Sequence, residues 1–171
     1  MTDSCGVRAA VLVIEDSDAF IRCIRAIGEE FGTHIICFNA EKLAGKRHAS
    51  LAIRHSIRSF RNGTAIAHSL EMEALLFASG SRQCTQGASF GIRSGENRLF
   101  VCCCPARDEI WKKLDQYSTW LDDDAYEELS PDKKDRLMTL FAIPQEELSV
   151  TGEDRITDLV LERVVLLETY R

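Results

Sequence analysis

The chain has 171 residues, of which 45% are hydrophobic and 28% are charged, as is ordinary for a folded globular protein. Its first apolar run, residues 7–14, is too short to span a membrane and lacks the features of a signal peptide. We therefore expect one cytoplasmic domain over residues 1–171, with no membrane partner and a net charge of −6.

The first 38 residues predict a strand, a helix and a second strand. Residues 7–14 are apolar and β-branched, as in a buried strand, and Asp16 or Ser17 can cap a following helix. Apolar residues recur at helical spacing over 18–31, and Gly32 ends the helix. Residues 33–38 read as the second strand. So short a β-α-β order favours a right-handed crossover between two parallel strands.

A basic segment follows in this acidic chain. Residues 42–98 carry nine lysines and arginines against three glutamates, a net charge of +6. We expect a helix over residues 47–61, ended by Asn62 and Gly63. The helical period of 3.6 residues places Arg47, Arg54, Arg58 and Arg61 on one face. That face is either a solvated surface or a phosphate-binding one.

The next predicted elements are shorter. Residues 64–79 form either one helix or a short helix followed by a strand at 74–78, and the second reading is favoured because a turn at Gly80 follows. Ser81 is a suitable cap for a helix over residues 82–90. Residues 99–104 predict a further strand, and Pro105 begins a helix that extends to residue 117. These elements predict an α+β fold, with helices packed on a central mixed or antiparallel sheet.

The C-terminal third is acidic, so we expect no polyanion to bind there. Residues 122–135 predict a surface turn and helix, and residues 153–168 predict the last helix. That last helix has two adjacent apolar stripes, the second formed by Leu161, Val165 and Leu166. Either deep burial or a protein partner accounts for the second stripe.

The seven cysteines show no repeating spacing, which argues for reduced thiols and against a disulfide framework. Cys102, Cys103 and Cys104 end an apolar strand, where a free cysteine behaves as a small hydrophobic residue. Alternating directions along a strand prevent the three from building a tetrahedral site alone. We therefore expect no metal and no cofactor.

Catalytic motifs are also missing. The sequence has no phosphate-binding GxxxxGK[ST] loop, no GxGxxG, no GxSxG and no HExxH, which argues against an enzyme. A thiol-dependent enzyme that uses Cys84, close to Arg82, is the remaining catalytic alternative.

The run EMEALLFASGSRQC at residues 71–84, continued by ASFGI at 88–92, resembles the PRPK-binding protein (TPRKB) family in its archaeal-type form. Members are small accessory subunits of the KEOPS/EKC complex. In that family a glutamate precedes an apolar strand, a Gly-Ser-Arg-Gln-Ile type turn follows, and a helix ends in Phe-Gly-Ile. Cys84 replaces the usual isoleucine here, and Gln86 and Gly87 replace a common Glu-Ala pair.

The resemblance implies a non-catalytic subunit of the machinery that installs threonylcarbamoyl on tRNA. Members bind the atypical kinase/ATPase subunit of KEOPS, and archaeal-type members recruit tRNA through its 3′ CCA end. Arg82 and Gln83 are then the candidates for the CCA contact. A protein-interaction subunit without RNA binding is the alternative.

Two further sets of candidates complete this hypothesis. The phosphate-facing surface would comprise Lys46, Arg47, Arg54, Arg58 and Arg61, with His48 or His55 stacked on an unpaired base. The kinase-binding candidates are Leu161, Val165 and Leu166.

Overall fold

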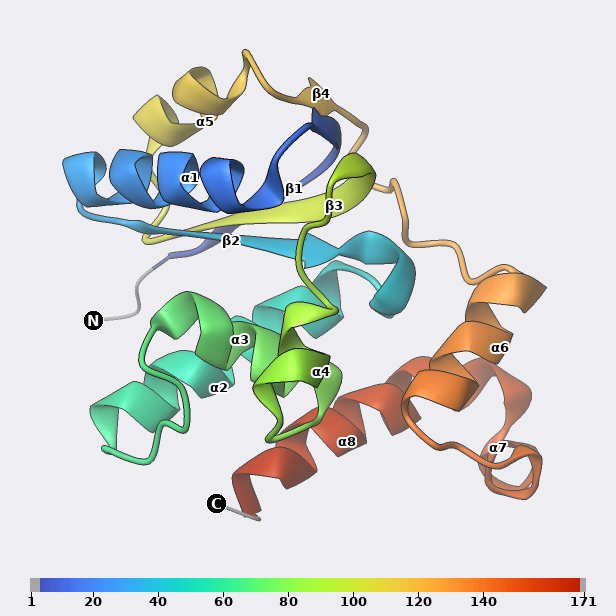
Figure 1. Cartoon of the computed structure of the whole chain (residues 1–171). Helices are drawn as coiled ribbons and strands as arrows, with labels where there is room; N and C mark the ends of the chain where they lie inside the picture. The colour runs from blue at the N-terminus through green and yellow to red at the C-terminus, as the bar shows by residue number, and fades with distance from the viewer. Residues whose placement is uncertain (1–3, 170–171) are drawn as a thin grey trace.

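The computed structural model describes residues 4–169, which form a sheet with helices on both faces (Figure 1). The strands are antiparallel to their neighbours and lie in the order β2-β3-β1-β4. Their bounds are β1 (Gly6–Ile14), β2 (His34–Asn39), β3 (Gly95–Cys104) and β4 (Thr119–Trp120). The helices are α1 (Ser17–Phe31), α2 (Lys46–Arg61), α3 (Leu70–Ser79), α4 (Cys84–Ala88), α5 (Asp108–Leu114), α6 (Pro131–Leu140), α7 (Gln145–Thr151) and α8 (Ile156–Thr169). Short 3-10 turns occupy Ala40–Lys42 and Glu153–Arg155. The α+β prediction is confirmed.

The N-terminal elements follow the sequence pattern closely. The Asp16 side chain accepts a hydrogen bond from the Ala19 backbone N–H at 3.1 Å, and Gly32 ends α1 with a φ of 65°. β1 and β2 run in the same direction, as predicted, but they are not neighbours. β3 lies between them and is antiparallel to both, so the crossover leaves room for a strand that comes much later in the chain.

Residues 74–78 are helical, so the prediction of a strand there is wrong. They belong to α3, whose N-terminus is capped by the Ser69 hydroxyl and whose C-terminus is Gly80 with a φ of 63°. Nearly every side chain of the second half of this helix is buried. The apolar residues therefore show no helical periodicity, and the run resembles a buried strand.

The sheet separates two apolar clusters. Ile35 and Cys37 of β2 point to the face that α1 and α5 cover, above the sheet in Figure 1. Ile36 and Phe38 point to the opposite face, where α2, α3 and α8 pack. α2 and α8 thus share one side of the molecule although about one hundred residues separate them in sequence.

α4 is only five residues long, shorter than the predicted helix over residues 82–90. Gly87 lies against α3, and a β-carbon at this position would come within 3.0 Å of the Leu76 side chain. The glycine that weakens the helix therefore permits close packing of α4 on α3.

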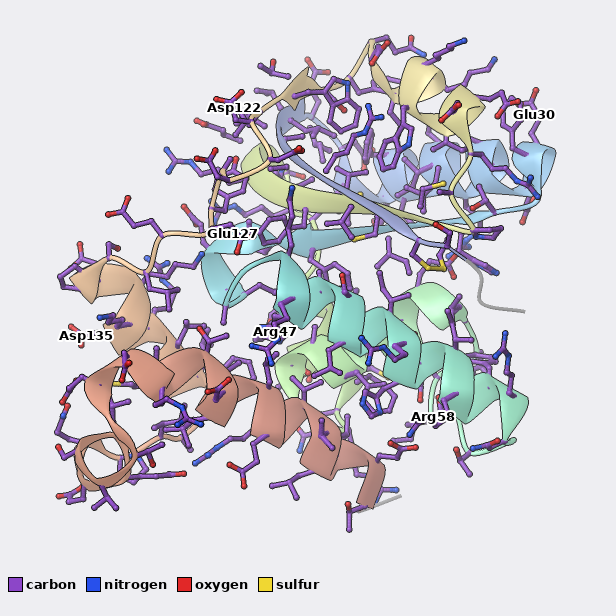
Figure 2. All side chains as sticks on the ribbon, turned by 180° about the vertical axis from the view of Figure 1, so that it is seen from behind. Glu30, Arg47, Arg58, Asp122, Glu127 and Asp135 are labelled. Atoms are coloured by element: carbon purple, nitrogen blue, oxygen red, sulfur yellow. A yellow bond between two sulfur atoms is a disulfide. The ribbon has the colours of Figure 1, made fainter. Side chains whose placement is uncertain are left out.

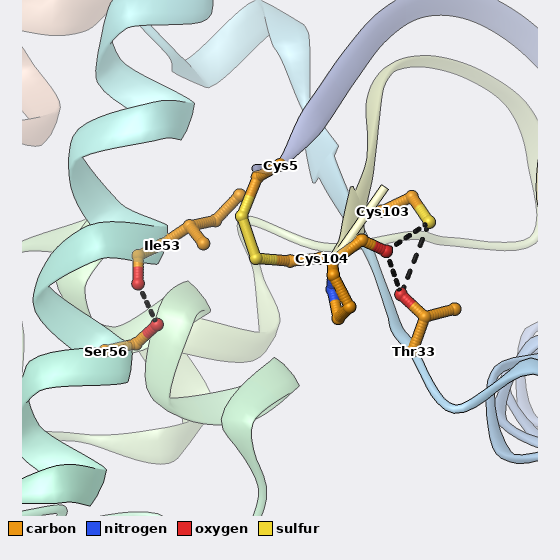
Figure 3. Close-up of a disulfide and its surroundings, with 7 residues drawn as sticks. Cys5, Thr33, Ile53, Ser56, Cys103 and Cys104 are labelled. Atoms are coloured by element: carbon orange, nitrogen blue, oxygen red, sulfur yellow. Dashed lines mark hydrogen bonds between the residues drawn. A yellow bond between two sulfur atoms is a disulfide. The ribbon is translucent and has the colours of Figure 1, made fainter. Parts of the chain in front are cut away.

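A disulfide joins Cys5 to Cys104, so the expectation of reduced thiols is wrong for these two residues (Figure 3). The bond ties the segment before β1 to the end of β3. Beside it, the Thr33 hydroxyl and the Cys103 thiol both donate to the Pro105 carbonyl (Figure 3). The spacing of the cysteines in the sequence does not indicate this disulfide. Cys5 and Cys104 meet only because β1 pairs with β3 in a register that places Gly6 opposite Cys103.

Candidate functional site

The basic face of α2 exists and is exposed. Ala49, Ala52 and Ile53 bury the opposite side of the helix. Arg47 and Arg58 lie on the outer side of α2, next to α8, as the rear view in Figure 2 shows. The amphipathic pattern thus predicted the helix and its orientation correctly.

Acidic side chains from the C-terminal half lie against this basic face. Arg47 pairs with Asp158 at 3.6 Å and Arg58 with Glu168 at 3.5 Å, both on α8. The Lys46 ammonium lies 3.6 Å from Asp123 of the acidic segment after β4. Water screens these exposed pairs, so each contributes little to stability, but they offset part of the positive charge that a phosphate backbone would meet.

The two histidines proposed to stack on a base are buried instead. His48 is fully buried: its Nδ1 accepts from the Ala44 N–H at 3.0 Å and its Nε2 donates to the Ala78 carbonyl at 2.8 Å. Burial, the largest cause, lowers the pKa of His48 to about 4. His55 is buried against Glu168 at 2.8 Å. Neither ring can reach a base, so both predictions are wrong.

The apolar stripe on α8 divides into buried and exposed members. Leu161 is 7% exposed and belongs to the core, whereas Val165 and Leu166 are 41% and 39% exposed. A hollow of about 450 Å³ lies between α2 and α8, lined by Arg54, Leu161 and Val165 among others. The three predicted partner-binding residues therefore do not act alike, because only two of them have much surface to offer.

Arg82 and Gln83 lie on an exposed loop (residues 80–91, here called the α4 loop). The Ser81 hydroxyl accepts a hydrogen bond from the Gln83 N–H at 3.1 Å. The first turn of α3, at the end of the helix opposite this loop, is held by Glu73. Its buried carboxylate accepts from the Ser59 hydroxyl and from the Ile66 and Ala67 N–H groups. The glutamate of the sequence motif thus anchors the helix that leads into the loop.

A second basic group, which the sequence analysis did not single out, lies beside the α4 loop. Lys42 donates to the Ser89 carbonyl at 2.9 Å, and its ammonium lies 5.4 Å from the centre of the Phe90 ring. Burial, and then repulsion from Arg93 and Arg136, lowers the pKa of Lys42. Arg136 reaches this region because its Nη1 donates to the carbonyl of Glu41, the residue before Lys42, at 2.9 Å. Lys42, Arg93 and Arg136 are here called a cluster of three cations. Arg136 comes from the acidic third of the chain, so net charge along the sequence concealed it.

Cys84 is exposed, but no hydrogen bond within residues 4–169 links its thiol to a histidine or a carboxylate. The same residues contain no group of three side chains suited to a metal ion. The thiol-dependent alternative therefore lacks a base at Cys84. No helix within the described range is long and apolar enough to cross a membrane.

Comparisons with known proteins agree with each other. A family model described as kinase binding protein CGI-121 matches residues 22–168. The regulatory protein Cgi121 of the archaeon Methanocaldococcus jannaschii is 28% identical over 151 residues, which cover 86% of this chain and 94% of the archaeal protein.

Proposed function

The chain belongs to the CGI-121 family of kinase-binding proteins, and from this premise we propose that it is a non-catalytic accessory subunit of the KEOPS complex. In this role it binds the atypical kinase/ATPase subunit and recruits tRNA by the 3′ CCA end for threonylcarbamoyladenosine formation.

The observation that carries the kinase contact is the exposure of Val165 and Leu166 on α8, whose other apolar side chains are buried in the core. Val165 also lines the hollow between α2 and α8, with Arg54 on its other side. An exposed apolar pair next to a hollow with a charged rim is typical of a protein interface, in which apolar anchors fill pockets and the rim sets specificity. We assign the kinase to this α2–α8 surface.

The test is co-purification of the cognate kinase subunit with the variants Val165→Glu and Leu166→Glu. We expect at least a tenfold loss of affinity with an unchanged unfolding midpoint. Val150→Glu is the matched control, because Val150 is 89% exposed and lies on α7. Retention of full kinase affinity by both α8 variants would contradict the assignment.

For tRNA we propose the α4 loop and not the outer face of α2. Arg82 and Gln83 lie on this exposed loop, and the cluster of Lys42, Arg93 and Arg136 lies close by. Single-stranded RNA ends are commonly bound by cations that contact phosphates together with side chains that contact splayed bases. The Arg–carboxylate pairs along α2 make that helix the less favourable phosphate surface.

Gel-shift titrations with intact tRNA and with tRNA that lacks CCA separate these surfaces. Arg82→Ala should weaken binding of intact tRNA only, whereas Arg93→Ala should weaken both and lower the salt slope by about one unit. Arg54→Ala, on α2, is the control and should change neither. No tRNA affinity in the unmodified protein at low salt would leave the alternative, a protein-interaction subunit, which the ion-paired α2 face favours.

A further inference from the structure

β2 is one of the two edge strands of the sheet, and it lies between α1 and α3 (Figure 1). A groove lined by residues of α1, β2 and α3 runs along its free edge. The groove encloses about 300 Å³, and at its His34 end it adjoins a larger hollow of about 600 Å³. Its walls are mainly apolar and include Ile21 and Ile24 from α1 and Met72 and Leu75 from α3.

One hydrogen bond at the end of β2 shows which of its residues direct their backbone groups toward β3 and which direct them toward the free edge. In an antiparallel strand, the N–H and C=O groups of successive residues point to opposite sides. The Asn39 N–H donates to the Phe90 carbonyl at 2.7 Å, and Phe90 is not part of β3. The backbone N–H and C=O groups of Asn39 therefore point away from β3, and so do those of Cys37 and Ile35, two and four residues earlier.

A hydrogen bond at the opposite edge of the sheet, beside β4, leads to the same assignment for β2. The Ala9 carbonyl accepts from the Leu121 N–H at 2.9 Å, so Ala9 points away from β3. Phe100, which lies opposite Ala9, must then point toward β2, where it faces Phe38. The backbone N–H and C=O of Phe38 are consequently hydrogen-bonded to β3, and the backbone N–H and C=O of its neighbour Cys37 point into the groove.

The outward backbone groups of Ile35 and Cys37 make no hydrogen bond within residues 4–169. Yet the two residues are only 3% and 8% exposed. Polar backbone groups in such a setting are nearly always paired in folded proteins. At the Asn39 end of β2 the chain itself supplies the partner, the Phe90 carbonyl. Two residues of the edge therefore present four backbone groups in an apolar groove.

We propose that this groove binds an extended peptide segment of another protein, which adds to β2 as an antiparallel fifth strand. Strand addition matches the array of donors and acceptors, and the apolar walls accept side chains on both faces of the added strand. The antiparallel direction agrees with every other pairing in the sheet. The groove is separate from the α2–α8 surface and adjoins the α4 loop only at Ala88 and Gly91. Arg82 and Gln83 do not line it, so the inference goes beyond the proposed function.

The distribution of charge along the groove indicates which end of the peptide carries a charged residue. Asp18 lies at the end near Asn39, whereas Arg25 and His34 at the opposite end are balanced by Glu71, whose carboxylate is paired with the His34 ring at 2.7 Å. An antiparallel strand places its N-terminal end near Asp18 and its C-terminal end near Arg25. The occupant is therefore a run of four or five apolar residues with a basic residue before it.

The other occupants fit less well. The edge of β2 is recessed between two helices, so the same edge of a second copy cannot reach it. Single-stranded RNA requires a basic groove with stacking platforms, whereas these walls include Asp18 and Glu71 and contain no aromatic side chain.

The experiment is selection of displayed random octapeptides on the full chain, with counter-selection on Met72→Arg, which places a long charged side chain in the groove. Val150→Arg is the matched control on an exposed position elsewhere. Ile21→Arg, on the α1 wall, replaces Met72→Arg if the latter does not show cooperative unfolding. We expect enriched peptides with a basic residue before an apolar run, and at least tenfold weaker binding to either groove variant but not to the control.

Backbone methylation of a selected peptide tests the mode of binding. N-methylation at the alternate residues that face β2 should reduce affinity at least tenfold, whereas N-methylation at the intervening residues should change it less than threefold. Three results would overturn the proposal: no enrichment over Met72→Arg, equal tolerance of both methylation sets, or groove-dependent binding of a single-stranded oligonucleotide in place of peptides.

Discussion

Replacement of the buried histidine at the start of α2 should change how the stability of the protein depends on pH. His48 has its ring between the Ala44 N–H and the Ala78 carbonyl, which fixes the neutral form with its proton on Nε2. A second proton on Nδ1 would remove the bond from Ala44 and place a charge in the core, on the same side as Lys133. His48 is therefore neutral in the folded state down to a low pH.

The size of the effect follows from the two pKa values. In the unfolded chain a histidine has a pKa of about 6.5, whereas in the folded protein the pKa of His48 is lowered to about 4. Between these values the unfolded state binds one more proton than the folded state. The free energy of unfolding should thus fall with decreasing pH, by roughly 3 kcal/mol in total and by up to about 1.4 kcal/mol per pH unit near pH 5.

Urea unfolding at pH 7.5, 6.5, 5.5 and 4.5 measures this contribution when the native chain is compared with His48→Gln. Glutamine cannot titrate, and its amide can still donate to Ala78. We expect His48→Gln to be less stable at pH 7.5 by about 1–3 kcal/mol, because the Ala44 N–H loses its acceptor. The difference should shrink as the pH falls.

Parallel pH curves for the two proteins would refute the reasoning. His68→Gln, at an exposed position, controls for the loss of a histidine elsewhere. Should His48→Gln fail to fold, titration of the His48 ring by NMR in the native protein decides the question, because a pKa above 6 would refute it equally.

Three other perturbations test the packing. Reduction of the Cys5 disulfide, which closes a loop of 99 residues, should lower the free energy of unfolding by up to about 4.7 kcal/mol; a reductant-independent urea midpoint would contradict this. Leu161→Ala should cost about 2–5 kcal/mol in thermal unfolding, and Val165→Ala less than about 1 kcal/mol, whereas equal losses would place both side chains in the core. The hydrogen bond that the His34 ring donates to Glu71 raises the pKa of His34. This pair therefore stabilises the fold below about pH 6.5 and ceases to do so as the pH rises through the raised pKa, and NMR titration should show a lower His34 pKa in Glu71→Gln.

Local sequence signals predicted the elements whose determinants lie within a few residues of each other. The cap at Asp16 and the left-handed glycine at position 32 fixed the ends of α1, and the apolar spacing fixed the face of α2 that is buried. α3 was misread because burial on almost all sides removes the periodicity on which such a prediction depends. The order of the strands could not be read either, since β3 inserts between two strands that precede it by more than fifty residues.

The candidate site was predictable only where function depends on exposed residue types. Arg82 and Gln83 are exposed, as their place in a turn suggests. His48 and His55 have the right chemistry for a base contact, but tertiary packing buries them. The charges of Asp158 and Glu168 offset the basic face from more than one hundred residues away, which no count over a local segment reveals.

The distribution of thiols makes this chain suitable for site-directed labelling without engineering. Five cysteines are unavailable to a mild reagent: Cys5 and Cys104 form the disulfide, and Cys37, Cys102 and Cys103 are buried. Burial also raises the pKa of Cys37 to about 12, so almost no reactive thiolate forms there. Cys23 is half-buried and hydrogen-bonded to the Tyr117 hydroxyl, which leaves Cys84 as the exposed thiol. A fluorophore at Cys84, one residue beyond Gln83, would report the arrival of an RNA end at the α4 loop in the otherwise native sequence.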